Sequence, residues 1–296
     1  PRKFKSGVSL DIDNSVDLYT YDCGLVGITD HGRITACQVL VGGGFGMTHN
    51  KPDTFARLAS AIGVVDPAHA VDAVRIVASI FRDCGNRADR RHARLKYLLE
   101  EWGVERFAGE FRRRAEFELR PPVTLPRPRQ LDHIGRFEQG DGREFYGVFV
   151  ENGRVLDTPQ VRYRSAFRTI AQRFAPGIRL TPMQSILFTD LDPAVTDELI
   201  AVLREHGVPT VEELSHARRW SMACPALPTC GLALADSERV MPDVIDAIER
   251  ELHRLGISDV PLTIRMTGCP NGCARPYNAD IGLVGRKPER YHVYVG

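Results

Sequence analysis

The stretch Thr267-Gly268-Cys269-Pro270-Asn271-Gly272-Cys273 and an earlier stretch, Cys224-Pro225-Ala226-Leu227-Pro228-Thr229-Cys230, give the chain two cysteine pairs, spaced C-x3-C and C-x5-C. Four thiolates are what a 4Fe-4S cluster needs, and soft sulfur ligands select iron–sulfur clusters, zinc or copper(I) over hard cations. Both stretches are rich in Pro and Gly, which favours shaped loops over helix interiors. We therefore predict a 4Fe-4S cluster whose metal ligands are Cys224, Cys230, Cys269 and Cys273.

Two other uses of these cysteines compete with a cluster. A structural zinc site usually has pairs spaced C-x2–4-C, and a five-residue spacer is wide for one tetrahedral ion. Disulfides fit poorly with the odd count of seven cysteines, and we expect no secretory leader. The remaining cysteines, Cys23, Cys37 and Cys84, are expected to be small buried hydrophobic residues.

The composition is that of an ordinary soluble protein, with 43% hydrophobic and 26% charged residues among 296. This length allows two or three domains with their own cores. No apolar run approaches the roughly 20 residues of a membrane span, and a net charge of +1 argues against bulk nucleic-acid binding. Because the chain opens at Pro1 without an initiator Met, we expect an internal piece of a longer polypeptide.

The predicted fold class is α+β, in three mixed α/β domains and a linker. The first domain covers 1–118 and the Pro-rich linker covers 119–131. A small ferredoxin-like domain covers 132–207, and the domain that carries the cysteine pairs covers 208–296.

Hydrophobic periodicity and turn residues predict the elements of each domain. In the first domain we expect a strand at 6–12, a hairpin of 25–29 and 34–41, and helices at 54–62, 67–81 and 89–101. In the second we expect strands at 145–150, 154–156 and 178–188, and helices at 165–174 and 193–206. In the third we expect a capping box from Thr210 to Glu213, a helix at 237–255 ended by Gly256, and strands at 261–266, 281–285 and 291–295.

Two further patterns allow more than one interpretation. Gly42-Gly43-Gly44-Phe45-Gly46 does not match G-x-G-x-x-G, so it is either a flexible turn or a place where backbone lies flat against a large planar ligand. In the basic segment after it, Arg90 and Arg94 lie one helical turn apart. This segment is either an exposed basic helix or a cradle for an anion.

Six motifs occur in order along the chain: Pro1-Arg2-Lys3-Phe4-Lys5, Leu40-Val41-Gly42-Gly43-Gly44, Asp83-x-Gly85-Asn86-Arg87-x-Asp89-Arg90, Ala93-Arg94-x-Lys96-Tyr97, and the two cysteine pairs. Together they resemble the sirohaem-containing sulfite and nitrite reductases, among them the haemoprotein β subunits of NADPH-dependent sulfite reductases. The resemblance covers 1–296 and implies the sirohaem sulfite/nitrite reductase fold, with a sirohaem pocket in the first domain.

The resemblance implies roles for individual residues. In the family the two cysteine pairs bind a 4Fe-4S cluster, and the last cysteine, here Cys273, also bridges to the sirohaem iron. Lys3 and Lys5 match two active-site lysines that hold the anionic substrate and deliver protons. The two-residue spacing of a strand would place both ammonium groups on one face.

Contacts to sirohaem are implied for four more residues: Arg94, Lys96, Arg179 and Gln184. Basic side chains are expected there because the macrocycle carries carboxylates. Met183 stands where relatives often have a polar residue. The family also builds its pocket with arginines from an earlier half of the polypeptide, which this sequence does not contain.

The activity implied is that of an assimilatory sulfite reductase, which reduces sulfite to sulfide by six electrons. The electrons would come from a flavoprotein α subunit that carries FAD and FMN and oxidises NADPH, in a cytoplasmic hetero-oligomer without nucleic acid or membrane. A sirohaem nitrite reductase is the first alternative. A zinc-binding structural or interaction module is an alternative of another class, and an electron carrier without haem fits the cysteine spacing less well.

Overall fold

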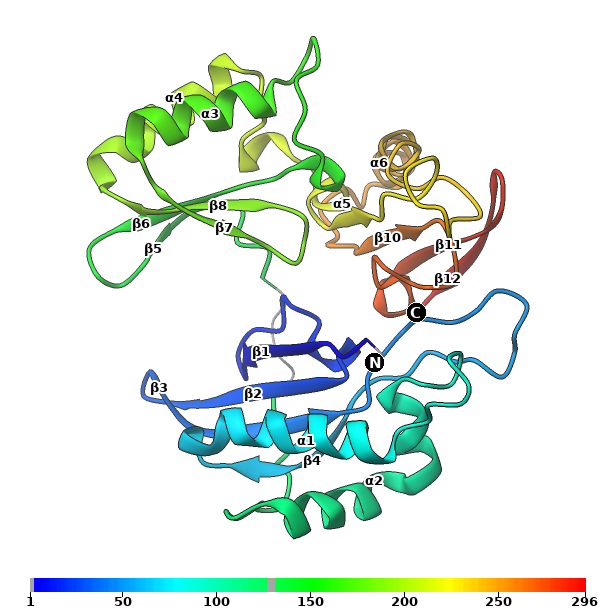
Figure 1. The fold of residues 1–296 in the computed structure, drawn as a ribbon. Helices are drawn as coiled ribbons and strands as arrows, with labels where there is room; N and C mark the ends of the chain where they lie inside the picture. The colour runs from blue at the N-terminus through cyan, green and yellow to red at the C-terminus, as the bar shows by residue number, and fades with distance from the viewer. Residues whose placement is uncertain (1–2, 127–130) are drawn as a thin grey trace. The chain divides into compact units, whose positions relative to one another are not determined.

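The computed structural model describes residues 3–126 and 131–296. Pro1 and Arg2 of the first motif and residues 127–130 of the predicted linker lie outside these ranges. The chain forms two compact units (Figure 1): Pro1–Leu131 with Pro270–Tyr277, and Asp132–Cys269 with Asn278–Gly296. The boundary falls inside the second cysteine pair, so that Cys273 belongs to the first unit.

A four-stranded sheet organises the first unit. Its order is β1-β2-β3-β4, formed by β1 (Ser6–Leu10), β2 (Cys23–Asp30), β3 (Arg33–Val41) and β4 (Ser60–Val65). β1 runs parallel to β2, and the other neighbours are antiparallel. The predicted hairpin is confirmed: positive φ at His31 and Gly32 is the geometry that a two-residue turn between antiparallel strands prefers.

Helices α1 (Ala70–Cys84) and α2 (Leu95–Arg114) cover one face of this sheet (Figure 1) and share its hydrophobic core. Short 3₁₀ turns η1 (Leu18–Thr20) and η2 (Pro67–His69) complete the unit. The predicted start of the helical segment at Pro67 is confirmed, because the Asp66 side chain accepts a hydrogen bond from the Ala68 amide at 2.9 Å.

Two predicted helices of the first unit are wrong in whole or in part. Residues 54–59 are irregular and β4 follows them, because a buried strand and a short apolar helix share the same residue types and tertiary pairing with β3 decides. Residues 85–94 are irregular too, and α2 begins only at Leu95. The Asn86 side chain accepts hydrogen bonds from the Ala88 and Asp89 amides, which closes a turn in place of a helix.

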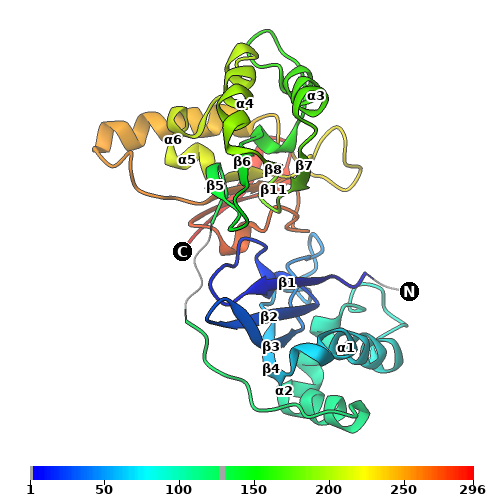
Figure 2. The same cartoon turned by 90° about the vertical axis from the view of Figure 1, so that its left-hand side faces the viewer.

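The first sheet of the second unit is antiparallel throughout, in the order β5-β6-β8-β7. Its strands are β5 (Gly135–Glu138), β6 (Glu144–Val148), β7 (Gly177–Leu180) and β8 (Ile186–Leu191). Helices α3 (Tyr163–Phe174) and α4 (Pro193–Glu205) lie together on one face (Figure 2), and the turn η3 (Glu151–Gly153) follows β6. The predicted strand at 178–188 is in fact two strands, and no strand forms at 154–156.

The second sheet of this unit has the order β12-β11-β10-β9. It consists of β9 (Ser221–Ala223), β10 (Ile264–Thr267), β11 (Ile281–Lys287) and β12 (Arg290–Val295), with α5 (His216–Arg219) and α6 (Met241–Leu255) packed against it and the turns η4 (Val211–Glu213) and η5 (Pro276–Asn278) at its connections. The predicted Thr210–Glu213 capping box and the end of α6 at Gly256 (φ 70°) are both confirmed.

The α+β class is confirmed by these three sheets and their helices. Within the described ranges, no helix is long and apolar enough to cross a membrane.

Candidate functional site

The two cysteine loops leave the same edge of one sheet. β9 and β10 are parallel neighbours, with Ala223 beside Met266, and the carboxyl ends of parallel strands lie together. The C-x5-C loop follows β9 directly, and the C-x3-C loop follows β10. The Cys224 amide continues the pairing by donating to the Met266 carbonyl at 3.1 Å.

A thiol of the first pair reaches the backbone beside the second pair. The Gly268 amide donates a hydrogen bond to Cys224 Sγ at 3.4 Å, and Gly268 is followed by Cys269. Backbone amides aimed at sulfur are a feature of iron–sulfur sites, where they tune the metal group. The donor chemistry of the two loops therefore fits a soft metal group.

Gly268 is the point where the two loops touch. A Cβ at this position would lie 2.5 Å from the Ala235 carbonyl oxygen and 2.6 Å from the Ala226 Cβ, distances that real Cβ contacts do not show. The Gly268 carbonyl accepts hydrogen bonds from the amides of Leu234 at 2.8 Å and Ala235 at 3.1 Å. Glycine is required here by close approach of backbone to backbone.

Gln184 supports the first cysteine loop from a neighbouring turn. Its Nε2 donates to the Ala223 carbonyl at 2.7 Å and its Oε1 accepts from the Ala223 amide at 3.2 Å. Gln184, a predicted contact of the cofactor, thus holds the backbone of Ala223, the residue directly before Cys224. Arg179 is placed differently: it lies exposed on β7 and donates to the Ile178 carbonyl.

Within the first unit, residues 270–277, which include Cys273, pack against residues 42–47, here called the glycine-rich loop. The Met47 amide donates to the Pro270 carbonyl at 3.0 Å, and the Tyr277 hydroxyl donates to the same oxygen at 3.1 Å. The Phe45 and Tyr277 rings meet edge to face, 5.6 Å apart. The glycine-rich loop therefore forms the support of the loop that carries Cys273.

The close contacts of Gly42 and Gly43 are made with the protein itself. A Cβ at Gly43 would meet the carbonyl oxygens of Tyr19 and Tyr21 at 2.3 and 2.5 Å, and Gly42 has a φ of 78° and would meet Leu99 at 2.4 Å. Chain packing thus explains both glycines without a planar ligand. At Gly46 a Cβ would make only ordinary contacts with Asn271.

Lys5 lies in a cluster of cations in the first unit. The Lys5 side chain is exposed, but nearby protein atoms partly desolvate its ammonium group, and this desolvation lowers the pKa of Lys5. The charges of Lys3 and Arg94 lower it further, while Cys273 and Asp22 act in the opposite direction. Lys3 and Lys5 precede β1, so strand alternation does not set their directions. Lys5 and Cys273 nevertheless lie close enough in the first unit for their charges to interact.

Arg94 is held by a carboxylate that the sequence reasoning missed. Its Nε and Nη2 donate to the two oxygens of Asp22 at 2.9 and 2.7 Å, and Asp22 is 0% exposed. Asp22 Oδ2 also accepts from the Lys5 amide at 2.8 Å. An acidic residue at the entry of an otherwise apolar strand was the available signal, since a buried carboxylate needs partners.

Lys96, a predicted contact of the cofactor, is buried among backbone carbonyls. Its side chain is 1% exposed, and its Nζ donates to the carbonyls of Gly44 at 3.2 Å, Gly46 at 2.8 Å and Phe55. Burial lowers the pKa of Lys96 to about 8. An ammonium group has three donors, and the structure directs all of them to backbone.

The other cysteines differ in burial. Cys23 and Cys37 are buried, which raises the pKa of both thiols, that of Cys23 to about 12; Cys84 is half-buried. None of the seven cysteines, all within the described ranges, forms a disulfide. Among the described residues no three Cys, His, Asp or Glu side chains are arranged to hold one metal ion, so convergence of the four thiols on one centre stays a prediction.

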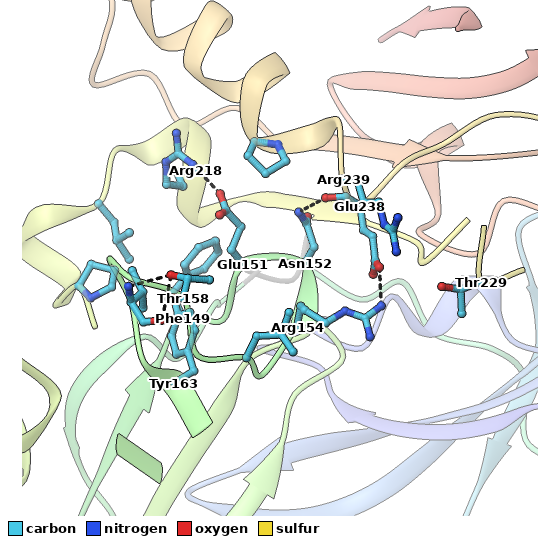
Figure 3. Close-up of a pocket in the computed structure, with 15 residues that line it drawn as sticks. Phe149, Glu151, Asn152, Arg154, Thr158, Tyr163, Arg218, Thr229, Glu238 and Arg239 are labelled. Atoms are coloured by element: carbon cyan, nitrogen blue, oxygen red, sulfur yellow. Dashed lines mark hydrogen bonds and ion pairs between the residues drawn. The ribbon is translucent and has the colours of Figure 1, made fainter. Parts of the chain in front are cut away.

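A pocket of about 560 Å³ lies beside the first cysteine loop, within the second unit. Thr229 of that loop lines it, and Arg154 and Glu238 form an ion pair in its wall (Figure 3). The Glu238 amide donates to the Cys224 carbonyl at 3.2 Å, so this wall is tied to the loop. The sequence reasoning missed the pocket because Glu151 and Asn152, which help to line it, belong to a segment that has only the signature of a turn.

Two family models match the chain. Residues 1–119 match "Nitrite and sulphite reductase 4Fe-4S domain", and residues 137–206 match "Nitrite/Sulfite reductase ferredoxin-like half domain".

Curated relatives and a solved structure match almost the whole chain. "Sulfite reductase (ferredoxin)" of Synechococcus elongatus is 44% identical over 297 residues, 100% of this chain and 48% of the relative. "Sulfite reductase (NADPH) hemoprotein beta-component" of Nitrobacter winogradskyi is 43% identical over 296 residues, 100% of this chain and 51% of the relative. The structure of Mycobacterium tuberculosis NirA aligns with a TM-score of 0.80 and 30% identity, over 99% of this chain and 54% of that chain.

The chain spans about half the length of these curated relatives. Both family models and both of these relatives agree with the motifs in the sequence, and the structural alignment extends the agreement to the fold. The chain belongs to the nitrite and sulfite reductase family.

Proposed function

We propose that the chain forms the cluster-bearing part of an assimilatory sulfite reductase haemoprotein that reduces sulfite to sulfide. The sulfur of sulfite passes from +4 to −2, so sulfite takes up six electrons and six protons and releases sulfide and three waters. The family assignment and the names of the relatives support this reaction.

The observation that carries the proposal is the setting of Lys5. Its ammonium group lies near the charges of Lys3 and Arg94, in the same unit as Cys273. A group of cations attracts an oxyanion, and a lysine whose pKa is lowered is a better proton donor near neutral pH. Lys3 and Lys5 would therefore bind sulfite and protonate its oxygens as each S–O bond breaks.

The cofactors proposed are a 4Fe-4S cluster and a sirohaem. Cys224, Cys230, Cys269 and Cys273 would hold the cluster, with Cys273 bridging to the sirohaem iron; bound in this way, the pair supplies electrons to the substrate. Arg94 would meet sirohaem carboxylates through the guanidinium donors that do not bind Asp22. Gln184 would support the cofactor site indirectly, by holding the backbone of Ala223. Arg179 would contact the sirohaem through its exposed guanidinium, and Lys96 would contribute by shaping the glycine-rich loop.

The electron donor proposed is an NADPH-oxidising flavoprotein α subunit carrying FAD and FMN, in a cytoplasmic hetero-oligomer. One group of relatives carries NADPH in its name and the Synechococcus relative carries ferredoxin. Turnover with each purified donor would separate the two. Nitrite is the second candidate substrate, since a family model names both nitrite and sulphite reductases and a cationic pocket accepts either anion.

The test begins with the full-length protein purified without oxygen. Visible absorption, iron, acid-labile sulfide and zinc are measured on one sample, and sulfite and nitrite turnover is measured with a chemical reductant. We expect sirohaem absorption, cluster iron and sulfide, and a higher kcat/KM for sulfite. A colourless protein with stoichiometric zinc would contradict the proposal and favour a zinc module.

The Lys5→Met variant tests the cationic group directly. We expect it to keep its cofactors and to lose about 10²-fold or more in kcat/KM for sulfite, the range found for removal of a positioned proton donor. Lys51→Met is the matched control, because Lys51 is exposed and its loss changes the net charge by the same amount. Equal kcat/KM in the two variants would argue against a role for Lys5.

A further inference from the structure

The ammonium group of Lys96 is a buried charge stabilised by backbone dipoles. Its Nζ donates to three carbonyls and lies 5.4 and 5.0 Å from the ring centroids of Phe55 and Tyr97. No carboxylate in the described part of the chain forms an ion pair with it. A buried ammonium is unfavourable unless all its donors are used, so the position of Lys96 requires these carbonyls to converge.

The three carbonyls come from two arms of one loop. Gly44 and Gly46 lie on the first arm, and Phe55 lies on the second. The arms are also joined directly, since the amides of Gly44 and Arg57 each donate to the carbonyl of the other, at 2.8 and 3.0 Å. Lys96 therefore fixes the spacing of the two arms near the end of the glycine-rich loop.

One peptide group connects Lys96 with the second cysteine loop. The Gly46 carbonyl accepts from Lys96 Nζ at 2.8 Å, and the amide of that same peptide group, the Met47 N–H, donates to the Pro270 carbonyl at 3.0 Å. A cation at the oxygen of a peptide group polarises it and strengthens the donor at its nitrogen. Pro270 lies between Cys269 and Cys273 in the sequence.

We propose that Lys96 is a positioning residue, which acts through the Gly46–Met47 peptide group and the Pro270 carbonyl to hold the loop that carries Cys273. The proposal rests on the proposed function in that it treats Cys273 as a cluster ligand. A lysine suits the task because its compact ammonium can serve three converging acceptors, whereas the planar fork of arginine directs its donors outward in one plane.

The test compares Lys96→Met with the exposed control Lys51→Met in the full-length, cofactor-loaded protein and in its apoprotein. In the apoprotein, hydrogen exchange should rise about tenfold or more in segments 42–47 and 270–277 of Lys96→Met, because a charged hydrogen bond to the loop is lost. Exchange in α1 serves as the internal reference and should change little. In the loaded protein we expect a more negative cluster midpoint potential and an altered EPR spectrum. Lys51→Met should show none of these changes.

Unchanged exchange at 270–277, or a uniform rise that includes α1, would overturn the proposal, as would a wild-type potential in folded Lys96→Met. If Lys96→Met does not fold, Lys96→Gln is used, because its amide keeps two donors without the charge. A wild-type cluster potential in Lys96→Gln would also overturn the proposal. Tyr277→Phe, which removes the other donor to Pro270, should shift the potential in the same sense. A wild-type protein without cluster iron and sulfide would refute the proposed function, while the exchange data would still decide the role of Lys96.

Discussion

Replacement of Gly268 by Ala tests the contact on which the two cysteine loops depend. The new Cβ would lie 2.5 Å from the Ala235 carbonyl oxygen and 2.6 Å from the Ala226 Cβ. Neither is the end of a flexible side chain, so backbone must move. Overpacking of this kind destabilises by about 1–3 kcal/mol. Loss of the two hydrogen bonds to the Gly268 carbonyl would add about 1 kcal/mol for each.

Gly231 provides the matched control in the same region. A Cβ there would meet nothing within 4 Å, so Gly231→Ala should be neutral or stabilising by about 0.4–1 kcal/mol. The assays are thermal unfolding of the full-length protein and the iron and acid-labile sulfide content of each variant. We expect a lower midpoint and reduced iron only in Gly268→Ala. A Gly268→Ala protein with the midpoint and iron content of Gly231→Ala would refute the packing argument.

Three further predictions concern side chains around the site. Asp22→Asn should destabilise by roughly 3 kcal/mol, because it leaves the mostly buried Arg94 without its carboxylate; urea unfolding measures it, and the exposed Asp30→Asn should change little. Gln184→Ala should destabilise by about 2 kcal/mol through two lost hydrogen bonds to Ala223 and lower cluster retention; retention equal to wild type would exclude a supporting role. The hydrogen bond to Asp89 raises the pKa of His92 in the folded protein, so this pair stabilises the fold when His92 is protonated. The stabilisation is full below pH about 6.5 and is lost as the pH rises through the raised pKa. His92→Gln should therefore destabilise more at pH 5.5 than at pH 9, and an equal effect at both would contradict the assignment.

The cysteine loops show which parts of the site could be predicted from sequence. Their ligand chemistry depends on residue type and spacing, and their meeting depends on β9 and β10 being parallel neighbours. The predicted strands at 261–266 and 281–285 already placed the second loop at a strand end. What the pattern could not contain was the Gly268 contact, because it depends on how residues 226–235 fold back, a tertiary detail without a local signal.

The wrong helices have a local cause. Residues 54–62 have apolar spacing that suits a helix and a buried strand equally, and only pairing with β3 separates the two. In residues 86–94 the Asn86 and Asp89 side chains bind the amides that a helix would use. Asn and Asp compete with helical hydrogen bonding in this way, so charge spacing alone was a poor guide to the start of α2.

The basic residues that the motifs grouped together have three different electrostatic situations. Lys5 is exposed and repelled by neighbouring cations, Arg94 is paired with the buried Asp22, and Lys96 is surrounded by carbonyls. Only a cation that keeps free donors can bind an incoming anion, and a guanidinium paired with a carboxylate is held in a fixed orientation. This difference agrees with the proposed roles, in which Lys5 would bind the substrate and Arg94 would orient the cofactor. Lys96 has no donor left for either task, which is why its effect on the site must pass through the peptide group that it holds.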